Sequence, residues 1–255
     1  MDERLAAFLN EKAEKYNCSE FIKNDPVQFP HYFSEKRDIE IAAFLASVIA
    51  WGNRRMIINS GKKLFAKIMG NRPYEYVMRG EWESADGSIN IHRTFFMRDL
   101  VYLCRGLKFI YSGYDSMESI FATEDVWKGI EAFRSALINA NIGEASRHIS
   151  NPVSEKGRPA SACKRLNMML RWLCRKDGIV DLGIWENISP DRLMIPLDVH
   201  VARISRELGL LQRKQNDRKS VELLTAQLRE LSPEDPVKYD FALFGIGVEE
   251  KNVNI

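Results

Sequence analysis

Ile-Pro-Leu-Asp-Val-His-Val-Ala-Arg-Ile-Ser-Arg-Glu-Leu-Gly-Leu, residues 195–210, is the stretch that says most about the fold. Pro196 keeps the chain before it extended, so a helix can begin only after this residue. Asp198 then fits the N-cap position, where unpaired backbone N–H groups favour a carboxylate. Apolar side chains follow at steps of three and four, at Val201, Ile204, Leu208 and Leu211. The stretch therefore predicts an amphipathic helix with an ionised carboxylate at its start.

Helical periodicity extends through nearly the whole chain, and no sustained alternation predicts a sheet. Turn-forming sequences such as Asn24-Asp25-Pro26 and Ala85-Asp86-Gly87-Ser88 separate the periodic segments. We therefore expect an all-α fold that forms a single unit over residues 1–255. The predicted helices cover residues 2–15, 38–51, 55–69, 97–111, 124–139, 161–176, 198–210, 219–231 and 236–244.

The composition is that of a globular protein, with 45% apolar and 28% charged residues. The sequence shows no secretory signal and no stretch of membrane-spanning length, so we expect a cytoplasmic protein without membrane contact. The histidines and cysteines lack the spacing of metal ligands, so we expect no metal and no cofactor. The oligomeric state is left open.

The charge of the chain is unevenly distributed. The whole chain carries +2, but the segment from Lys156 to Lys219 has 14 Lys and Arg residues against 7 Asp and Glu. This segment is therefore +7 and the remainder is −5. Phosphate binding needs local positive charge rather than a basic whole. The segment is either a nucleic-acid-binding surface or a basic solvated face.

The stretch around Asp198 resembles a known motif. Pro196-Leu197-Asp198-Val199-His200-Val201, followed by Arg203, is similar to the Val-Asp-Thr-His-Val-x-Arg segment of the helix-hairpin-helix DNA glycosylases, the superfamily that includes endonuclease III. Val199 stands where that motif usually has Thr. The helix Asp38 to Ala50, which ends in Trp51-Gly52-Asn53-Arg54-Arg55, resembles an early superfamily helix whose polar loop meets DNA.

Two further stretches resemble an uncharacterised bacterial family, domain of unknown function 2400, which is grouped loosely with that superfamily. They are Ser161-Ala162-Cys163-Lys164-Arg165-Leu166-Asn167 with Arg171-Trp172, and Lys238-Tyr239-Asp240-Phe241-Ala242-Leu243-Phe244-Gly245. The resemblance implies a two-lobed helical fold, with a helical barrel at residues 29–195 and a second lobe made of residues 1–28 and 196–255.

The resemblance also implies an enzyme of DNA base-excision repair, a hydrolase or lyase that removes a damaged base, such as an oxidised purine, from duplex DNA. Asp198 would stabilise the positive charge that develops on the deoxyribose. Bifunctional members use a lysine that attacks the sugar C1′, and Lys164 is the candidate here. Arg171 and Arg175 share a helix face with it, where they would favour the neutral amine and hold phosphates.

The sequence departs from endonuclease III in three places. Only Gly157 precedes Lys164, in Glu155-Lys156-Gly157-Arg158-Pro159, where endonuclease III has a Gly-x-Gly hairpin. The 34 residues from Lys164 to Asp198 make a wider gap, closer to that of the archaeal 8-oxoguanine glycosylases. No cysteine follows Cys174, so we expect no iron–sulfur cluster.

The basic and polar residues expected to contact DNA are Asn53, Arg54, Arg55, Arg158, Arg165, Arg171, Arg175, His200 and Arg203. A base flipped out of the duplex needs an apolar pocket, for which Trp51, Trp172 and Trp185 are candidate walls. Two other functions stay open. One is a non-catalytic nucleic-acid-binding protein on the same fold, and the other is an enzyme that uses Asp198 on a nucleoside or small molecule. The basic segment favours the nucleic-acid functions over the last.

Overall fold

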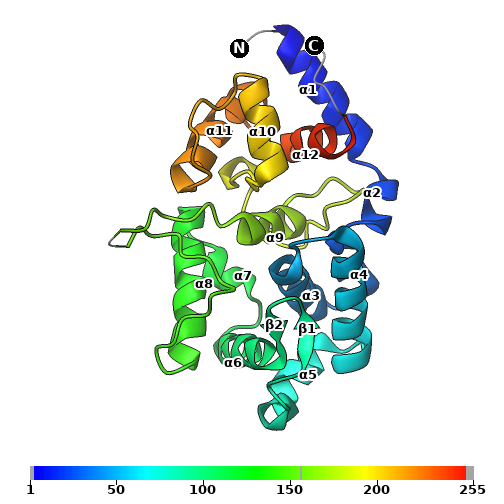
Figure 1. Cartoon of the computed structure of the whole chain (residues 1–255), viewed down its shortest axis with the longest axis vertical. Coiled ribbons are helices and arrows are strands. Elements are labelled where there is room, and N and C mark those ends of the chain that lie inside the picture. Colours follow the sequence, from blue (N-terminus) through cyan, green and yellow to red (C-terminus); the bar gives the residue numbers. More distant parts are fainter. Residues whose placement is uncertain (1–2, 156, 251–255) are drawn as a thin grey trace. The chain divides into compact units, whose positions relative to one another are not determined.

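The computed structural model describes residues 3–155 and 157–250, and these residues are predominantly helical (Figure 1). The strands within them, β1 (Asn90–His92) and β2 (Phe95–Phe96), pair as one short antiparallel hairpin. The expectation of a mainly helical chain is thereby confirmed. None of the helices in the described ranges has the length and apolarity that crossing a bilayer requires.

Contacts along the chain define two compact units. We call residues Ile22 to Ser150 the central unit, and the residues up to Phe21 together with those from Asn151 onward the terminal unit. These boundaries differ from the expected lobes, which divided after residues 28 and 195. The second boundary comes earlier because the segment before Lys164 is tied to a C-terminal helix, where the N–H of Arg218 donates to the carbonyl of Ala160 at 3.0 Å. Residues 1, 2 and 251–255 of the expected second lobe lie outside the described residues.

The central unit is built around α3, in which every residue from Ile39 to Ile49 is buried. A helix that is buried on all sides forms the middle of a core. Nearby, α6 and α8 approach closely because Gly106 has no side chain, and a Cβ there would lie 2.1 Å from Leu137. The helices of this unit are α3 (Lys36–Ile49), α4 (Arg54–Lys62), α5 (Pro73–Arg79), α6 (Met97–Gly113), α7 (Glu118–Phe121) and α8 (Val126–Ala140). A π-helical segment, Lys63–Ile68, continues α4, and α2 (Ser19–Lys23) contains the crossing from the terminal unit.

The terminal unit consists of α1 (Glu3–Tyr16), α9 (Lys164–Cys174), α10 (Val199–Glu207), α11 (Arg218–Leu231) and α12 (Tyr239–Glu249). Helix α12 contacts both α1 and α10 (Figure 1). Two glycines allow this, since a Cβ at Gly245 would lie 2.2 Å from Tyr16 and one at Gly247 would lie 2.8 Å from His200. The predicted helix 236–244 ends too early for this reason, because these glycines serve close packing rather than helix termination.

The remaining differences from the predicted helices are local. Helix α9 begins three residues later than predicted because Cys163 adopts a left-handed backbone with φ of +46°. Helices α2, α5 and α7 were not predicted, since such short segments show no clear periodicity. The predicted helix 2–15 starts at a residue outside the described range. Short 3-10 turns lie at Pro26–Gln28, Pro30–Tyr32, Glu81–Ser84, Pro190–Arg192 and Pro236–Lys238.

Candidate functional site

Asp198 is the N-cap of α10, as the sequence predicts. Its Oδ1 atom accepts hydrogen bonds from the backbone N–H groups of His200 and Val201, both at 2.8 Å. The loop that leads to it is held in place because the N–H of Ile195 donates to the hydroxyl of Thr225 at 3.1 Å. Only 14% of the Asp198 side chain is exposed. One carboxylate oxygen is thus fixed by the helix, and the other is available to a neighbour.

That neighbour is Lys164, the first residue of α9. Its Nζ atom lies 3.9 Å from Oδ2 of Asp198, and its side chain is 29% exposed. The turn that aims it is fixed from both sides, since Ser161 pairs with Asp217 and the amide of Asn167 donates to the carbonyl of Ala162 at 3.0 Å. The structure therefore brings together the two residues expected to carry catalysis. A primary amine beside a fixed carboxylate has the elements of an activated nucleophile.

Arg171 and Arg175 do not lie on the exposed face beside Lys164 that their spacing in the sequence predicts. They are 3% and 8% exposed and belong to a buried ionic network. Arg171 contacts Asp181 at 3.2 Å and forms an ion pair with Asp240, while Arg175 contacts Asp235 at 2.8 Å and Asp181 at 3.1 Å. Carboxylates compensate both guanidinium groups. The two arginines are therefore not available to bind phosphate, and they do not provide the positive charge that was expected to favour a neutral Lys164.

Asp240 is a residue of this site that sequence reasoning did not identify. It lies in the first turn of α12, is 6% exposed, and is held by Arg171. Burial raises its pKa to about 7, and Arg171 opposes that rise. The charges of Asp198 and Lys164 also act on this carboxyl, in opposite directions, which places Asp240 in the electrostatic neighbourhood of the pair. A single acid within the apolar run of residues 239–246 was the available signal.

The other expected DNA contacts of the terminal unit have mixed surroundings. Arg158 is exposed and closes a tight turn, in which its backbone pairs with Glu155 and Gly157 has φ of +80°. Arg165 is partly buried, which lowers the pKa of its guanidinium. His200 and Arg203 both contact the carbonyl of Gly247, at 3.1 and 3.0 Å. Of these four, Arg158 and Arg203 are exposed.

Trp51 and the residues Asn53 to Arg55, which were expected to contact a flipped base and DNA, belong to the central unit. Asn53 caps α4 by accepting from the N–H of Met56 at 3.3 Å, and Arg54 and Arg55 follow it on the exposed first turn. Trp51 is partly buried and stacks on His92, with their ring centroids 4.8 Å apart.

Trp172 and Trp185 are core residues. They are 1% and 2% exposed, so neither forms the wall of an open base pocket.

The basic segment from Lys156 to Lys219 is less available to a nucleic acid than its net charge suggests. Three of its arginines pair with carboxylates from outside the segment: Arg171 with Asp240, Arg175 with Asp235, and Arg218 with Glu222. Part of the +7 charge is therefore compensated within the fold.

Comparison with curated proteins found no match, and neither did comparison with solved structures. A family model does match. It covers residues 25–249, which include α9, α10 and α12, and so contain Lys164, Asp198 and Asp240. The chain therefore belongs to the DUF2400 family, which is described as a family of proteins of unknown function.

Proposed function

We propose that this protein is a DNA base-excision glycosylase with a lyase step, and that it removes a damaged base, with oxidised purines as the first class to test. The observation that carries the proposal is the 3.9 Å separation of Lys164 Nζ and Asp198 Oδ2. The two residues are 34 positions apart in the sequence, and each is placed by the start of its own helix. The resemblance around Asp198 supplies the reaction class.

The reaction follows from the two groups. Asp198 Oδ2 accepts a proton from the ammonium of Lys164, and the neutral amine attacks the deoxyribose C1′. The N-glycosidic bond breaks, and the base leaves with the bonding electron pair and takes up the proton that Asp198 accepted. Loss of the amine proton and opening of the sugar ring then give a Schiff base between Nζ and C1′. Once Asp198 has given its proton to the base, its carboxylate stabilises the positive charge that remains on the sugar.

Duplex oligonucleotides that contain 8-oxoguanine, uracil or an abasic site test the proposal in the presence of borohydride. Borohydride reduces the Schiff base to a stable amine, so the protein should become covalently attached to DNA. Lys164→Gln should abolish the adduct. Lys176→Gln is the matched control because Lys176 is an exposed lysine just after the same helix.

Asp198→Asn separates catalysis from capping, since asparagine is also a good N-cap. We expect about a 100-fold or greater loss of base release, in the range of general acid–base catalysis, with the fold retained. Full activity in Asp198→Asn would refute the role of the carboxylate. Salt-sensitive DNA binding without adduct or base release from any duplex would instead favour the non-catalytic binding protein.

A further inference from the structure

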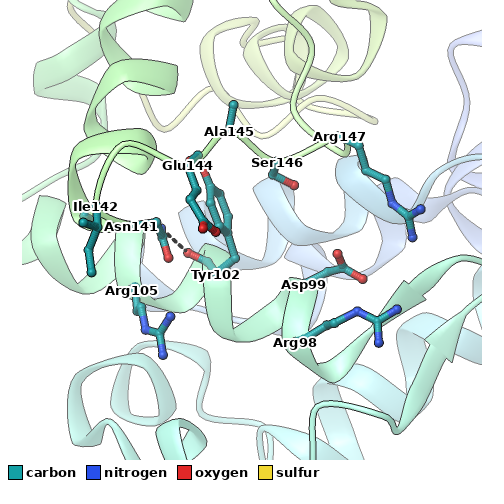
Figure 2. A pocket seen from close by; sticks show the side chains of 11 residues that line it. Arg98, Asp99, Tyr102, Arg105, Asn141, Ile142, Glu144, Ala145, Ser146 and Arg147 are labelled. Atoms are coloured by element: carbon teal, nitrogen blue, oxygen red, sulfur yellow. Dashed lines mark hydrogen bonds between the residues drawn. The ribbon is translucent and has the colours of Figure 1, made fainter.

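A hollow of about 860 Å³ lies in the central unit between α6 and the loop after α8 (Figure 2). Its size falls within the usual range for small-molecule sites. One wall is a single face of α6, because Arg98, Tyr102 and Arg105 are four and three residues apart. The facing wall is the loop from Asn141 to Arg147. None of these residues belongs to the Lys164 and Asp198 site.

Hydrogen bonds across the hollow hold its two walls together. The amide of Asn141 donates to the carbonyl of Tyr102 on α6 at 3.0 Å, and it is oriented by a second bond to the carbonyl of Leu137 in its own segment at 2.8 Å. In the other direction, the hydroxyl of Tyr102 donates to the carbonyl of Glu144 at 2.8 Å. The close contact of Gly106 with Leu137 fixes α6 against α8. A ligand would therefore meet a preformed site and lose little affinity to ordering the protein.

One end of the hollow is suited to an anion. Figure 2 shows the guanidinium groups of Arg98 and Arg147 at the same end, on either side of Asp99. Within residues 3–155 and 157–250, no carboxylate forms an ion pair with either arginine. The carboxylate of Asp99 has partners of its own within the fold. It accepts a hydrogen bond from the N–H of Phe96 at 2.8 Å and lies 3.5 Å from His148. Two guanidinium groups that share one end of a site favour a phosphate.

The opposite end combines apolar surface with a hydrogen-bond acceptor. Ile142 is 98% exposed and has φ of +56°, a backbone conformation that is unusual for a β-branched residue. Glu144 lies next to Tyr102 on the side of the hollow away from the two arginines, and its carboxylate forms no ion pair within the part of the chain that the structure describes. Arg105 at this end is compensated by Glu83, which accepts from its Nε at 2.8 Å. A flat ring with an amino group matches these surroundings, since a carboxylate accepts from the amino group of a base.

We propose that this hollow binds a nucleotide, with its phosphate at Arg98 and Arg147 and an amino-bearing base at Glu144. The same chemistry is present in a free nucleotide and in one nucleotide of a single strand. The inference is independent of the glycosylase proposal, because it uses other residues and another unit.

Titration calorimetry of the full chain with cytidine 5′-monophosphate, uridine 5′-monophosphate and cytidine tests this site. The two nucleotides differ in the amino or carbonyl group at position 4 of the base. We expect cytidine 5′-monophosphate to bind about tenfold more tightly than uridine 5′-monophosphate, the effect of one charge-assisted hydrogen bond, and more than about tenfold more tightly than cytidine, which lacks the phosphate that both arginines contact. Arg98→Gln and Arg147→Gln should each weaken its binding by about the same factor, and Glu144→Gln should remove the preference over the uridine nucleotide.

Arg72→Gln is the control, because Arg72 is an exposed arginine of the central unit outside the hollow, and it should change nothing. Lys164→Gln should also leave binding unchanged, which separates this proposal from the glycosylase activity. A 5′-phosphorylated cytidine trinucleotide distinguishes the two sources. Tighter binding that depends on Arg147 identifies a strand, whereas binding equal to that of the mononucleotide identifies a free nucleotide.

Three results would overturn the proposal. The first is the absence of saturable binding up to about 5 mM nucleotide, above the 1 mM dissociation constant of weak complexes. The second is cytidine binding as tightly as its monophosphate, which would remove the phosphate site. The third is unchanged binding in both arginine variants, with melting temperatures that show them to be folded.

Discussion

The two ends of α9 carry basic side chains in opposite surroundings. At its start, Lys164 is 29% exposed and lies 3.9 Å from one carboxylate oxygen. Toward its end, Arg171 and Arg175 are nearly inaccessible, and each contacts at least two carboxylates. Burial of a charge requires such compensation, whereas a reactive amine must stay accessible to substrate. The comparison shows that the same helix supplies a structural ionic network at one end and a candidate nucleophile at the other.

The largest effect on stability is expected from Arg171→Leu. The substitution leaves Asp181 and Asp240 buried without this partner, and breaking a buried ion pair from one side costs about 3–5 kcal/mol. Urea denaturation followed by far-UV circular dichroism measures the loss. Lys164→Gln is the matched change at the other end, and it should alter stability by less than about 1 kcal/mol because that pair is partly exposed. Equal losses of unfolding free energy in the two variants would contradict the distinction between a structural ionic network at one end of α9 and an accessible lysine at the other.

A smaller effect should appear in the pH dependence of stability. Because burial raises the pKa of Asp240 to about 7, the folded state holds this proton more tightly than the unfolded state does. The contribution of Asp240 to the free energy of unfolding is therefore greatest below about pH 4 and is lost as the pH rises toward 7. Asp240→Asn should flatten this slope. A slope unchanged between the two proteins would show that Asp240 ionises as it does in the unfolded chain.

The smallest effect concerns the cap of α10. Asp198→Ala removes the acceptor for the N–H groups of His200 and Val201 and should cost about 1 kcal/mol. Asp198→Asn keeps an acceptor there and should cost less. Thermal unfolding of the two variants measures the difference, and base release measured on the same samples should be low in both. If stability and activity fell in proportion, the carboxylate would be acting only as a cap.

The parts of this fold that depend on local sequence could be predicted. Apolar periodicity located α3, α10 and α11, and the Pro196 to Asp198 sequence placed the cap. Lys164 was chosen through a resemblance, and the structure places it beside Asp198.

The parts that depend on distant residues could not be predicted. Periodicity assigned Arg171 and Arg175 to a polar face of α9, but it contains no information about what covers that face. Their carboxylate partners include Asp235 and Asp240, which are 60 and 69 residues away and meet them only in the folded chain. The hollow beside α6 was missed for the same reason, since its two walls come from separate segments.

The terminal unit is built from two separate segments of the chain, and this affects the order in which the protein can fold during synthesis. The central unit is one continuous segment, from Ile22 to Ser150, and can fold while the ribosome is still translating the later residues. The terminal unit combines α1 with α12, and Arg171 obtains its partner Asp240 only when α12 emerges. Lys164 and Asp198 belong to this unit, and α10, which Asp198 caps, packs on α12, so their surroundings are completed late in translation. A nascent chain would acquire its fold in one half before it could acquire the proposed activity in the other.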